Sequence, residues 1–266
     1  MELSKEFQTN RQNWNDRTPV HVESDLYELE AFRNGKNILR QLELAELGEV
    51  RGKSLLHLQC HFGMDTLSWA RLGAKVTGVD FADAAIAQAQ KLSTELNIPA
   101  QFILSDVYSA PAVHQEKYDI VFTSYGTIGW LPDLDKWASV LKHFLKPGGV
   151  FYIAEFHPVI WMFDDKFEKI IYSYFNNGPD YEVIQGTYTD PEADLSGGNY
   201  YWSHSLSEVV MALKNAGLEI EFLHEHNYIN WNCLSGLEEI GPYQYILPKW
   251  GPKVPYMYSI KAVLPA

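Results

Sequence analysis

The sequence predicts a doubly wound α/β fold, in which helices cover both faces of a parallel β-sheet. The first observation is a regular alternation, from residue 54 to residue 154, of short apolar segments with segments of helical periodicity. The second is that the apolar segments are continuously apolar or β-branched, as strands buried on both faces are. The third is their spacing, which suits right-handed crossovers between parallel strands.

Five strands are expected in this region, at residues 54–58, 75–79, 101–104, 118–123 and 150–154. Helices at residues 65–72, 82–96 and 133–145 connect them, and each ends near a glycine or a proline. The spacing of Leu134, Trp137 and Leu141 gives the last of these helices an apolar face.

Two segments are expected to elaborate this core, which a chain of 266 residues is long enough to enclose. Residues 1–50 are interpreted as an N-terminal helical cap, because Leu42, Leu44 and Leu47 offer an apolar face. Residues 51–266 are interpreted as the main domain, which carries an insert at about residues 156–203.

The insert is rich in aromatic side chains and breaks the alternation of strand and helix. Residues 169–175 and 181–189 are β-like and flank a turn at residues 176–180. This arrangement predicts a β-hairpin.

The α/β pattern resumes after the insert. Ser205 and Glu208 predict a capping box at the start of a further helix, which Gly217 ends. Residues 218–226 and 256–264 supply two more strands.

Composition narrows the classes of partner. The chain has 34 acidic and 21 basic residues, and its net charge of −13 argues against a nucleic-acid surface, which needs clustered Lys and Arg. Cys60 and Cys233 are too few for a disulfide framework. No signal-peptide core and no membrane-spanning run is visible, so we expect a soluble cytoplasmic protein without a membrane partner.

Polar side chains follow the strands at the edge where an open parallel sheet binds its ligands. Asp80 follows the second strand, about 20 residues after the first turn, where a carboxylate can accept both hydroxyl groups of a ribose. Alternatively, Asp80 caps the helix that begins at Ala82. Asp106, after the third strand, favours the ligand interpretation, because a second acid there can accept from an adenine amino group.

With these residues in place, the chain resembles the class I S-adenosylmethionine-dependent methyltransferases. The resemblance covers roughly residues 50–155, and more loosely residues 205–264. Its combined motifs are also similar to those of a bacterial subgroup of small-molecule methyltransferases. The matching segments are LLHLQCHFG, VTGVDFADAAIAQAQ, FILSDVYSA, YDIVFTSYG and FLKPGGVFYIAEFHP.

The resemblance implies a Rossmann-like sheet of seven strands with the last strand antiparallel. It implies that S-adenosyl-L-methionine is the cofactor, with its methionine end on the loop after the first strand and its ribose on Asp80. Phe81 is implied to lie against the adenine, and Asp106 and the Val107 amide to contact its amino group. The implied cofactor-binding residues are Gln59, Cys60, His61, Gly63, Thr66, Asp80, Phe81, Asp106, Val107, Ser124 and Tyr125.

The first motif departs from the family pattern. The family has an acid near the position of His57 and glycines at those of Gln59 and His61, and here only Gly63 matches. Because such a loop binds its ligand through backbone groups, a cofactor loop of low glycine content is still expected.

Two residues are candidates for catalysis. Tyr125 follows the fourth strand, where the acceptor and the methyl group meet, and His157 follows the fifth strand and titrates near neutral pH. Glu155 is a weaker candidate, with an orienting role. The alternatives are that Tyr125 is a wall residue and that His157 is a hydrogen-bonded residue of the turn before Pro158.

Aromatic side chains outside the sheet predict a covered site. Trp14, His21 and Tyr27 are interpreted as one half of a lid, and the hairpin expected at residues 170–190 as the other half. A covered aromatic pocket suits a small, partly apolar acceptor better than a polymer. The alternative is that these aromatic side chains form the core of an added β-layer.

No metal site is expected. His57, Cys60 and His61 lack a fourth ligand for a closed zinc site, and His57 lies inside a strand. His224 and His226 share one strand face, for which surface or pocket lining is the commoner role.

Three other functions compete with methyl transfer to a small molecule. An NAD-dependent oxidoreductase also uses an acid at Asp80, but the second and third glycines of the dinucleotide motif are missing. An RNA or protein methyltransferase fits less well, because the chain is acidic and no motif for such an acceptor follows the fourth strand. A non-catalytic S-adenosylmethionine-binding protein on the same fold stays possible on sequence alone.

Overall fold

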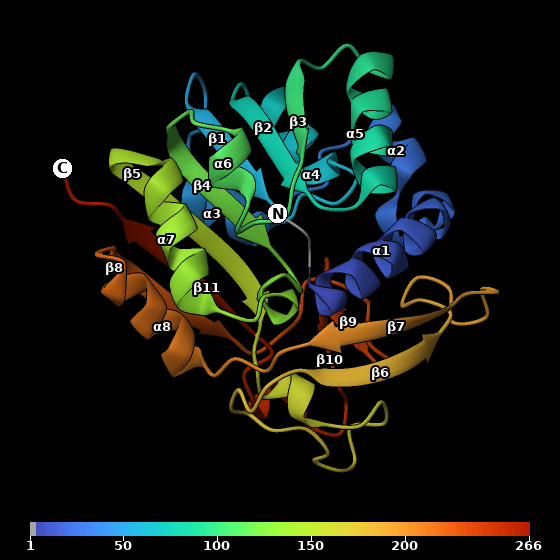
Figure 1. Ribbon diagram of the computed structural model, residues 1–266. Helices are drawn as coiled ribbons and strands as arrows, with labels where there is room; N and C mark the ends of the chain where they lie inside the picture. Colours follow the sequence, from blue (N-terminus) through green and yellow to red (C-terminus); the bar gives the residue numbers. More distant parts are fainter. Residues whose placement is uncertain (1–3) are drawn as a thin grey trace.

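The computed structural model describes residues 4–266, which form a seven-stranded sheet with helices on both faces (Figure 1). The strand order is β3-β2-β1-β4-β5-β11-β8. Strands β1 to β5 run parallel to their neighbours in this group, and β11 runs antiparallel to both β5 and β8. The predicted seven-stranded α/β fold with an antiparallel last strand is confirmed.

The alternating region has all the predicted elements. Its strands are β1 (Ser54–Leu58), β2 (Lys75–Asp80), β3 (Ala100–Leu104), β4 (Tyr118–Ser124) and β5 (Leu145–Phe156). The helices between them are α4 (Met64–Arg71), α5 (Asp83–Glu95) and α7 (Leu134–Phe144), and the prediction missed a short helix α6 (Ala110–Val113). Strand β5 begins at Leu145 rather than at Val150.

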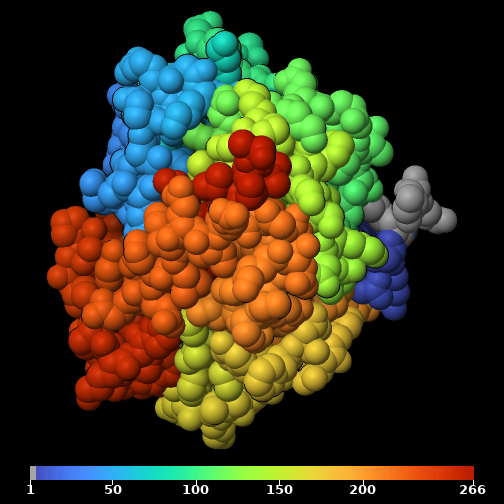
Figure 2. All heavy atoms as spheres, turned by 90° about the vertical axis from the view of Figure 1, so that its left-hand side faces the viewer, coloured from blue at the N-terminus to red at the C-terminus, as the bar shows by residue number. Residues whose placement is uncertain are grey.

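The sheet separates two buried cores. Because successive side chains of a strand point to opposite faces, Leu55 and Leu56 of β1 enter different cores. Leu56 packs with α7 and with α8 (Leu206–Asn215), and Leu55 packs with α3 (Gln41–Leu47) and α4. In Figure 2, α8 and its neighbours (orange) and the C-terminal segment (red) cover one face, and the insert (yellow) lies at its lower end.

The N-terminal segment consists of α1 (Lys5–Glu23), a 3₁₀ turn (Asp25–Tyr27), α2 (Leu29–Arg33) and α3. Ser4 caps α1 by accepting the backbone N–H of Phe7. The side chain of Asn10 accepts the backbone N–H of Tyr200 at 2.8 Å and donates to the Tyr200 carbonyl at 2.7 Å. These paired bonds hold α1 against β7 (Ser196–Tyr201) of the insert (Figure 1).

The predicted hairpin of the insert is wrong in its first strand. Strand β6 (Asp180–Gln185) pairs antiparallel with β7, and residues 169–175 form no strand beyond an isolated bridge of Ile170 to Phe163. The ring of Tyr181 lies where a Cβ atom of Gly198 would be, with its hydroxyl 2.7 Å from that position. This cross-strand fit favours the glycine-containing segment over the β-branched one, although intrinsic strand propensity favours the reverse.

The C-terminal part contains β8 (Glu219–His226) and β11 (Met257–Val263), as expected. Between them lies a small hairpin of β9 (Glu238–Gly241) and β10 (Gln244–Ile246), which the sequence did not predict. Within residues 4–266, no helix combines the length and the apolarity that crossing a bilayer requires.

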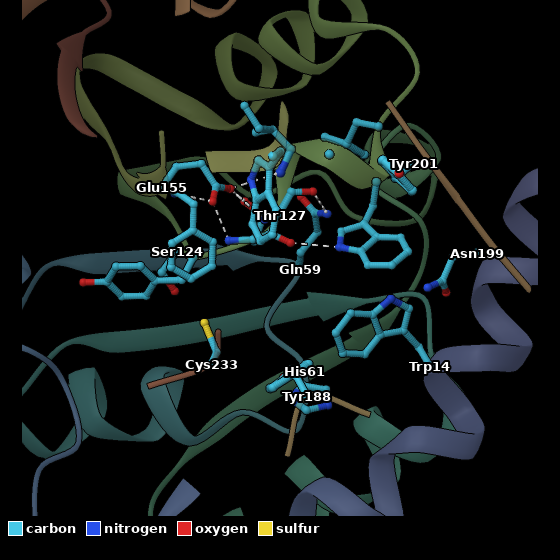
Figure 3. Close-up of a pocket in the computed structure, with 18 of the residues that line it drawn as sticks. Trp14, Gln59, His61, Ser124, Thr127, Glu155, Tyr188, Asn199, Tyr201 and Cys233 are labelled. Atoms are coloured by element: carbon cyan, nitrogen blue, oxygen red, sulfur yellow. Dashed lines mark hydrogen bonds between the residues drawn. The ribbon is translucent and has the colours of Figure 1, made fainter. Parts of the chain in front are cut away.

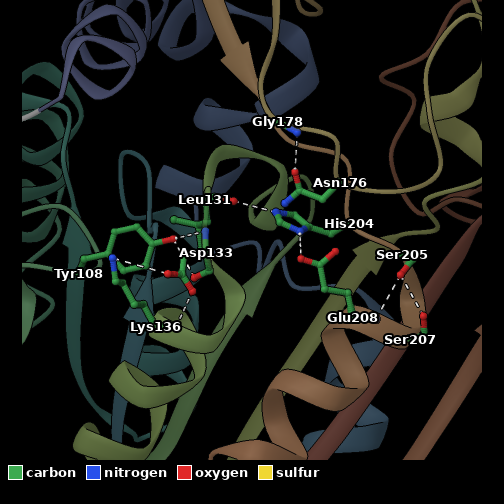
Figure 4. A network of polar contacts seen from close by, with 10 residues as sticks. All are labelled: Tyr108, Leu131, Asp133, Lys136, Asn176, Gly178, His204, Ser205, Ser207 and Glu208. Carbon is green, nitrogen blue, oxygen red and sulfur yellow. Dashed lines mark hydrogen bonds and ion pairs between the residues drawn. The ribbon is translucent and has the colours of Figure 1, made fainter.

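The capping box at α8 is confirmed only in part (Figure 4). The Ser205 hydroxyl accepts the backbone N–H of Glu208 at 3.2 Å, as predicted. The Glu208 carboxylate does not turn back to Ser205; it lies 3.0 Å from Nδ1 of His204. His204 is buried, and its Nε2 lies 2.7 Å from the Leu131 carbonyl, so Glu208 anchors the histidine that precedes the N-cap residue Ser205 instead.

Candidate active site

A cavity of about 550 Å³ lies at the carboxyl ends of β1 to β5, beneath α1 and the insert (Figure 3). This edge of the sheet is where the sequence placed the ligand. The volume is in the range of small-molecule sites. Ten of the eleven predicted cofactor-binding residues line the cavity: Gln59, Cys60, His61, Gly63, Asp80, Phe81, Asp106, Val107, Ser124 and Tyr125.

The eleventh residue, Thr66, lies behind the cavity wall. Its side chain is fully buried, and its hydroxyl contacts Nδ1 of His57 at 2.8 Å. The preceding residue, Asp65, lines the cavity instead, and its carboxylate accepts a hydrogen bond of 3.2 Å from the Ser124 hydroxyl. The sequence prediction therefore chose the correct turn of α4 and the wrong face.

The loop after β1 contains few glycines, yet its backbone has the conformation that is typical of glycine-rich loops. Gln59 has φ 56°, His61 has φ 50° and Gly63 has φ 80°, so alternate residues are left-handed. For the two residues with side chains, this conformation costs roughly 1–2 kcal/mol each. Strain of this kind persists where the surrounding structure enforces it and is concentrated at functional sites.

Gly63 has a second role in this loop. A Cβ atom at this position would lie 2.8 Å from Cβ of Ala89 and 2.8 Å from the ring of Phe102. Its absence lets α4 start close to α5 and β3, which explains why this one glycine of the motif is present.

Asp80 holds the loop from the tip of β2. Its Oδ2 atom accepts the backbone N–H of His61 at 2.8 Å, and its Oδ1 atom accepts that of Ala82 at 2.9 Å. Each carboxylate oxygen retains a further lone pair for a ligand. Burial raises the pKa of Asp80 to about 6, against these hydrogen bonds, which lower it. The alternative that Asp80 caps α5 is wrong, because this helix begins at Asp83 with Ala82 as its N-cap residue and no side-chain cap. The bond of Asp80 to Ala82 instead holds the turn before the helix.

The adenine end of the expected site lies beside β3. The Oδ1 atom of Asp106 accepts the backbone N–H of Ser109 at 2.9 Å, and Asp106 also lines the cavity. Phe81 lies edge-on to Phe7 of α1, with ring centroids 6.4 Å apart, and both rings line the cavity. An apolar slot with an acid at its end suits a flat heterocycle that carries an amino group.

Glu155, at the end of β5, organises the loop after β4 (Figure 3). Its buried carboxylate accepts the backbone N–H groups of Gly126, Thr127 and Ile128 and the Thr127 hydroxyl. These bonds lower the pKa of Glu155, but burial outweighs them and raises it. Glu155 therefore fixes the backbone of the loop after β4.

Tyr125 lines the cavity with its ring and is left-handed at φ 36°. Its hydroxyl donates to the Glu43 carboxylate at 2.7 Å and accepts from the side-chain amide of Asn230 at 3.2 Å. Burial and the nearby Glu43 carboxylate raise the pKa of Tyr125 well above its usual value. The phenol is therefore protonated at neutral pH and cannot serve as a base.

The structure does not bring His157 to the cavity. Its Nδ1 atom accepts the backbone N–H of Val159 at 3.3 Å, and its Nε2 atom lies 3.1 Å from the carboxylate of Glu225 on β8. Burial lowers the pKa of His157, and Glu225 raises it. This placement matches the alternative of a hydrogen-bonded turn before Pro158.

Buried polar atoms without partners test whether the cavity fits a polar ligand. Among residues 4–266, Oε1 of Gln59 and Nε2 of His57 are buried and make no hydrogen bond, and both residues line the cavity. The unpartnered oxygen of Gln59 is a hydrogen-bond acceptor. Burial also keeps Asp65 a weak acid, with a pKa of about 6. The acceptors fit an ammonium group such as that of S-adenosylmethionine.

The two segments that the sequence assigned to a lid meet over the cavity. The Trp14 ring lies against His61 and Trp130, with centroids 5.2 and 5.3 Å away. The Tyr27 hydroxyl bonds to that of Tyr188 in the insert, and Nε2 of His21 lies 2.7 Å from the Thr187 hydroxyl. Residues from α1, the 3₁₀ turn and the insert thus form one wall, and the insert takes part through the segment between β6 and β7.

The histidines considered as metal ligands make other contacts. His224 lies 2.7 Å from the Glu46 carboxylate, and His226 lies 3.1 Å from the Ser259 hydroxyl. Within the described part of the chain, no three His, Cys, Asp or Glu side chains are grouped for a metal ion.

Sequence analysis missed several residues of the site. Asp65 was one position from a predicted residue. Arg17 lines the cavity from α1, and its spacing from Trp14 and His21, three and four residues, is a signal of one helix face that could have found it. Glu43 lies on α3, far in sequence from the tyrosine it contacts, and no local pattern indicates that pair.

The sequence of this chain is similar to those of known methyltransferases. Residues 55–149 match the family model described as "Methyltransferase domain". The ubiquinone biosynthesis O-methyltransferase of Saccharophagus degradans is 26% identical over 188 residues, which is 70% of this chain and 71% of the relative. The enzyme with the same description from Proteus mirabilis is 29% identical over 153 residues, 51% of this chain and 62% of the relative.

Solved structures share the fold. A protein assigned as an S-adenosylmethionine-dependent methyltransferase from Listeria monocytogenes aligns with TM-score 0.60 and 18% identity, over 85% of this chain and 96% of that one. DhpI, in its SAH complex, aligns with TM-score 0.57 and 14% identity, over 98% of this chain and 97% of that one. At these sequence identities the similarity shows a shared fold and nothing more.

Proposed function

Since the chain is a class I S-adenosylmethionine-dependent methyltransferase, we propose that its cavity binds S-adenosylmethionine across the tips of β1, β2 and β3. The enzyme then transfers the methyl group to a small molecule bound beside β4. The observation that supports this most strongly is the pair of acids Asp80 and Asp106 at the tips of neighbouring strands of one cavity. Asp80 is paired in register with Leu104, two residues before Asp106, so the two acids follow adjacent strands at one edge of the sheet.

In this proposal, Asp80 accepts the ribose hydroxyl groups and Asp106 accepts the adenine amino group. Phe81 and Phe7 lie on the adenine face. The methionine end lies on the loop from Gln59 to Gly63, and the ammonium group is received by Asp65 and the unpartnered oxygen of Gln59.

S-adenosylmethionine supplies a methyl group on a positively charged sulfur, which is already activated for displacement. The protein's task is therefore alignment, with the reacting atoms held roughly 3–3.5 Å apart. Tyr125 is placed for this task, because Glu43 and Asn230 fix its hydroxyl and Glu155 fixes the adjoining loop. Aromatic walls such as Tyr125 and Trp231 also favour a cation.

The function assigned to Tyr125 is positioning, since its protonated hydroxyl already donates to Glu43. His157 would act only through a rearrangement that breaks its contact with Glu225. If the acceptor releases its proton to water during or after methyl transfer, neither Tyr125 nor His157 is needed as a base.

We also propose that the N-terminal segment carrying Trp14, His21 and Tyr27 and the insert at about residues 156–203 act together as a lid on the main domain. The contacts of Tyr27 with Tyr188 and of His21 with Thr187 join the two segments above the cavity. Limited proteolysis with and without S-adenosylhomocysteine tests this: ligand should protect both segments together. Equal cleavage rates in both conditions would remove the lid.

The proposed cofactor is tested by thermal unfolding with S-adenosylmethionine, S-adenosylhomocysteine or NAD. A ligand that binds only the folded protein raises the midpoint of unfolding. The first two ligands should raise it and NAD should not. A shift with NAD alone would contradict the proposal.

A further inference from the structure

Arg17 is a buried cation without a counter-ion. Its side chain lines the cavity, and the residue is only 5% exposed. Its Nε atom is buried and makes no hydrogen bond, and no carboxylate among residues 4–266 forms an ion pair with it. By contrast, Arg11, on the same helix, makes a two-pronged ion pair with Asp83 at the surface.

Burial of this charge is costly. Burial lowers the pKa of Arg17, yet a guanidinium stays protonated in proteins. The chain compensates the charge only with the ring of Trp14, 5.7 Å from the guanidinium carbon, and with the nearby Tyr188. A buried charge that lacks a partner costs several kcal/mol, so an anion supplied from outside would be bound strongly there.

The walls next to Arg17 are aromatic and uncharged. Trp14, Tyr27 and Tyr188 line this part of the cavity, and burial lowers the pKa of the neighbouring His21 to about 3. His21 is therefore neutral. The carboxylates of the insert that also line the cavity do not act on the pKa of Arg17, which responds to burial and to Tyr188.

We propose, on the basis of the proposed function, that Arg17 binds a carboxylate of the methyl acceptor and that the acceptor is a small aromatic monocarboxylate. The guanidinium supplies planar, bidentate recognition of the carboxylate, and the rings of Trp14, Tyr27 and Tyr188 contact the flat body of the acceptor. A single arginine compensates a single negative charge, which favours a monocarboxylate over a doubly charged phosphate.

The cofactor also has a carboxylate, but a different arginine, Arg40, lies next to residues that line its expected end of the cavity. The Arg40 guanidinium lowers the pKa of Asp65, at the start of α4, and lies 4.2 Å from the ring centre of Trp231. Arg17 instead lies on α1 next to Tyr188 of the insert. The elements that form its surroundings are those added to the sheet, where the acceptor rather than the cofactor is expected.

Calorimetric titration with matched acid and amide pairs tests the inference. The protein, saturated with S-adenosylhomocysteine, is titrated with 3,4-dihydroxybenzoate and its amide, phenylacetate and its amide, and indole-3-acetate and its amide. At least one carboxylate should bind tenfold or more tightly than its amide. The preference should disappear in Arg17→Met, persist in part in Arg17→Lys and be unchanged in the surface control Arg11→Gln.

Three results would overturn the inference. Native protein that prefers none of the carboxylates has no anion site for the acceptor. A preference that survives in Arg17→Met assigns the site to another residue. A tenfold loss of S-adenosylhomocysteine affinity in Arg17→Met, with the acid preference intact, assigns the arginine to the cofactor. Native protein that binds no S-adenosylhomocysteine would contradict the proposed function as well.

Stability supplies an independent readout. If Arg17 were a structural residue, Arg17→Met would lower the midpoint of thermal unfolding. Because the substitution removes an uncompensated buried charge and keeps an apolar stem of similar length, we expect the midpoint without ligand to be unchanged or higher. A lower midpoint would contradict a site that is kept for binding.

Discussion

The Oδ2 atom of Asp80 accepts the backbone N–H of His61 at 2.8 Å, which joins the tip of β2 to the loop after β1. His61 is left-handed, with φ 50°, at a position where the family resemblance implies a glycine. The residue expected to hold the ribose thus also holds the loop expected to carry the methionine end. The two halves of the proposed cofactor site therefore depend on one carboxylate.

Asp80→Asn should weaken S-adenosylhomocysteine binding roughly a hundredfold. Two hydrogen bonds to a charged carboxylate are lost or reduced, each worth about 1.5 kcal/mol or more, and 1.4 kcal/mol corresponds to a factor of ten. Isothermal titration calorimetry measures the change. The control is Asp83→Asn, three residues away, which removes a surface ion pair with Arg11 and should leave the affinity unchanged. Equal effects of both substitutions would show that Asp80 has no direct contact with the ligand.

Gln59→Gly should be tolerated, whereas Gln59→Val should not. The left-handed φ of 56° costs a non-glycine residue roughly 1–2 kcal/mol, and a β-branched residue more. Glycine relieves that strain but loses the hydrogen bond of Gln59 Nε2 to the Thr127 carbonyl. We expect a free energy of unfolding within about 1 kcal/mol of native for glycine and a loss of about 2 kcal/mol or more for valine, measured in urea. If the order were reversed, the loop would not have this backbone in solution.

Glu155→Ala should destabilise the protein by about 3 kcal/mol or more. The substitution leaves the backbone N–H groups of Gly126, Thr127 and Ile128 without their acceptor in a buried position, at about 1–3 kcal/mol for each group that stays unpaired. Urea unfolding gives the energy, and amide exchange should accelerate most at residues 126–128. Exchange that accelerates evenly across β4 and β5 would indicate general destabilisation without a role in orienting the loop.

His57→Gln should make stability less sensitive to acid. Burial lowers the pKa of His57 to about 3, below the unfolded value near 6.5. Its neutral form is therefore favoured by folding, so its contribution is complete above pH 6.5 and is lost as the pH falls below that value. At pH 5 the loss is about 2 kcal/mol, because one unit of pKa corresponds to about 1.4 kcal/mol.

The measurement is urea unfolding of native protein and of His57→Gln at pH 8 and pH 5. The stability of the native protein relative to the variant should fall by about 2 kcal/mol between these two conditions. Other titrating groups act on both proteins and cancel in the difference. A difference that does not change with pH would mean that His57 is accessible to protons in the folded state.

Local patterns were sufficient to predict the sheet and the position of the site. Each strand of the alternating region has a hydrophobic run bounded by turn residues, and parallel pairing brings their carboxyl ends to one edge. That is why Asp80 and Asp106, 26 positions apart in the sequence, could be assigned to one cavity from their places after β2 and β3. The low glycine content did not prevent the prediction, because Gln59 and His61 adopt the glycine conformation under constraint from Asp80 and Thr127.

Contacts between distant segments could not be predicted in this way. The pairing of β6 with β7 depends on the fit of Tyr181 over Gly198, which no propensity scale contains. His157 was assigned to the cavity because β5 ends there, but its ring lies beside Tyr258 of β11 and contacts Glu225 of β8. The spacing of Arg17 from Trp14 and His21 indicates a shared helix face, but only the structure shows that its Nε atom is buried without a hydrogen-bond partner.

The crystal structure of the protein with S-adenosylhomocysteine tests the central claim most directly. The account predicts ribose hydroxyl groups within hydrogen-bond distance of the Asp80 carboxylate and the adenine amino group within that distance of Asp106. A structure in which the nucleoside lies elsewhere, and in which both carboxylates contact only water and backbone groups, would contradict the proposed cofactor site.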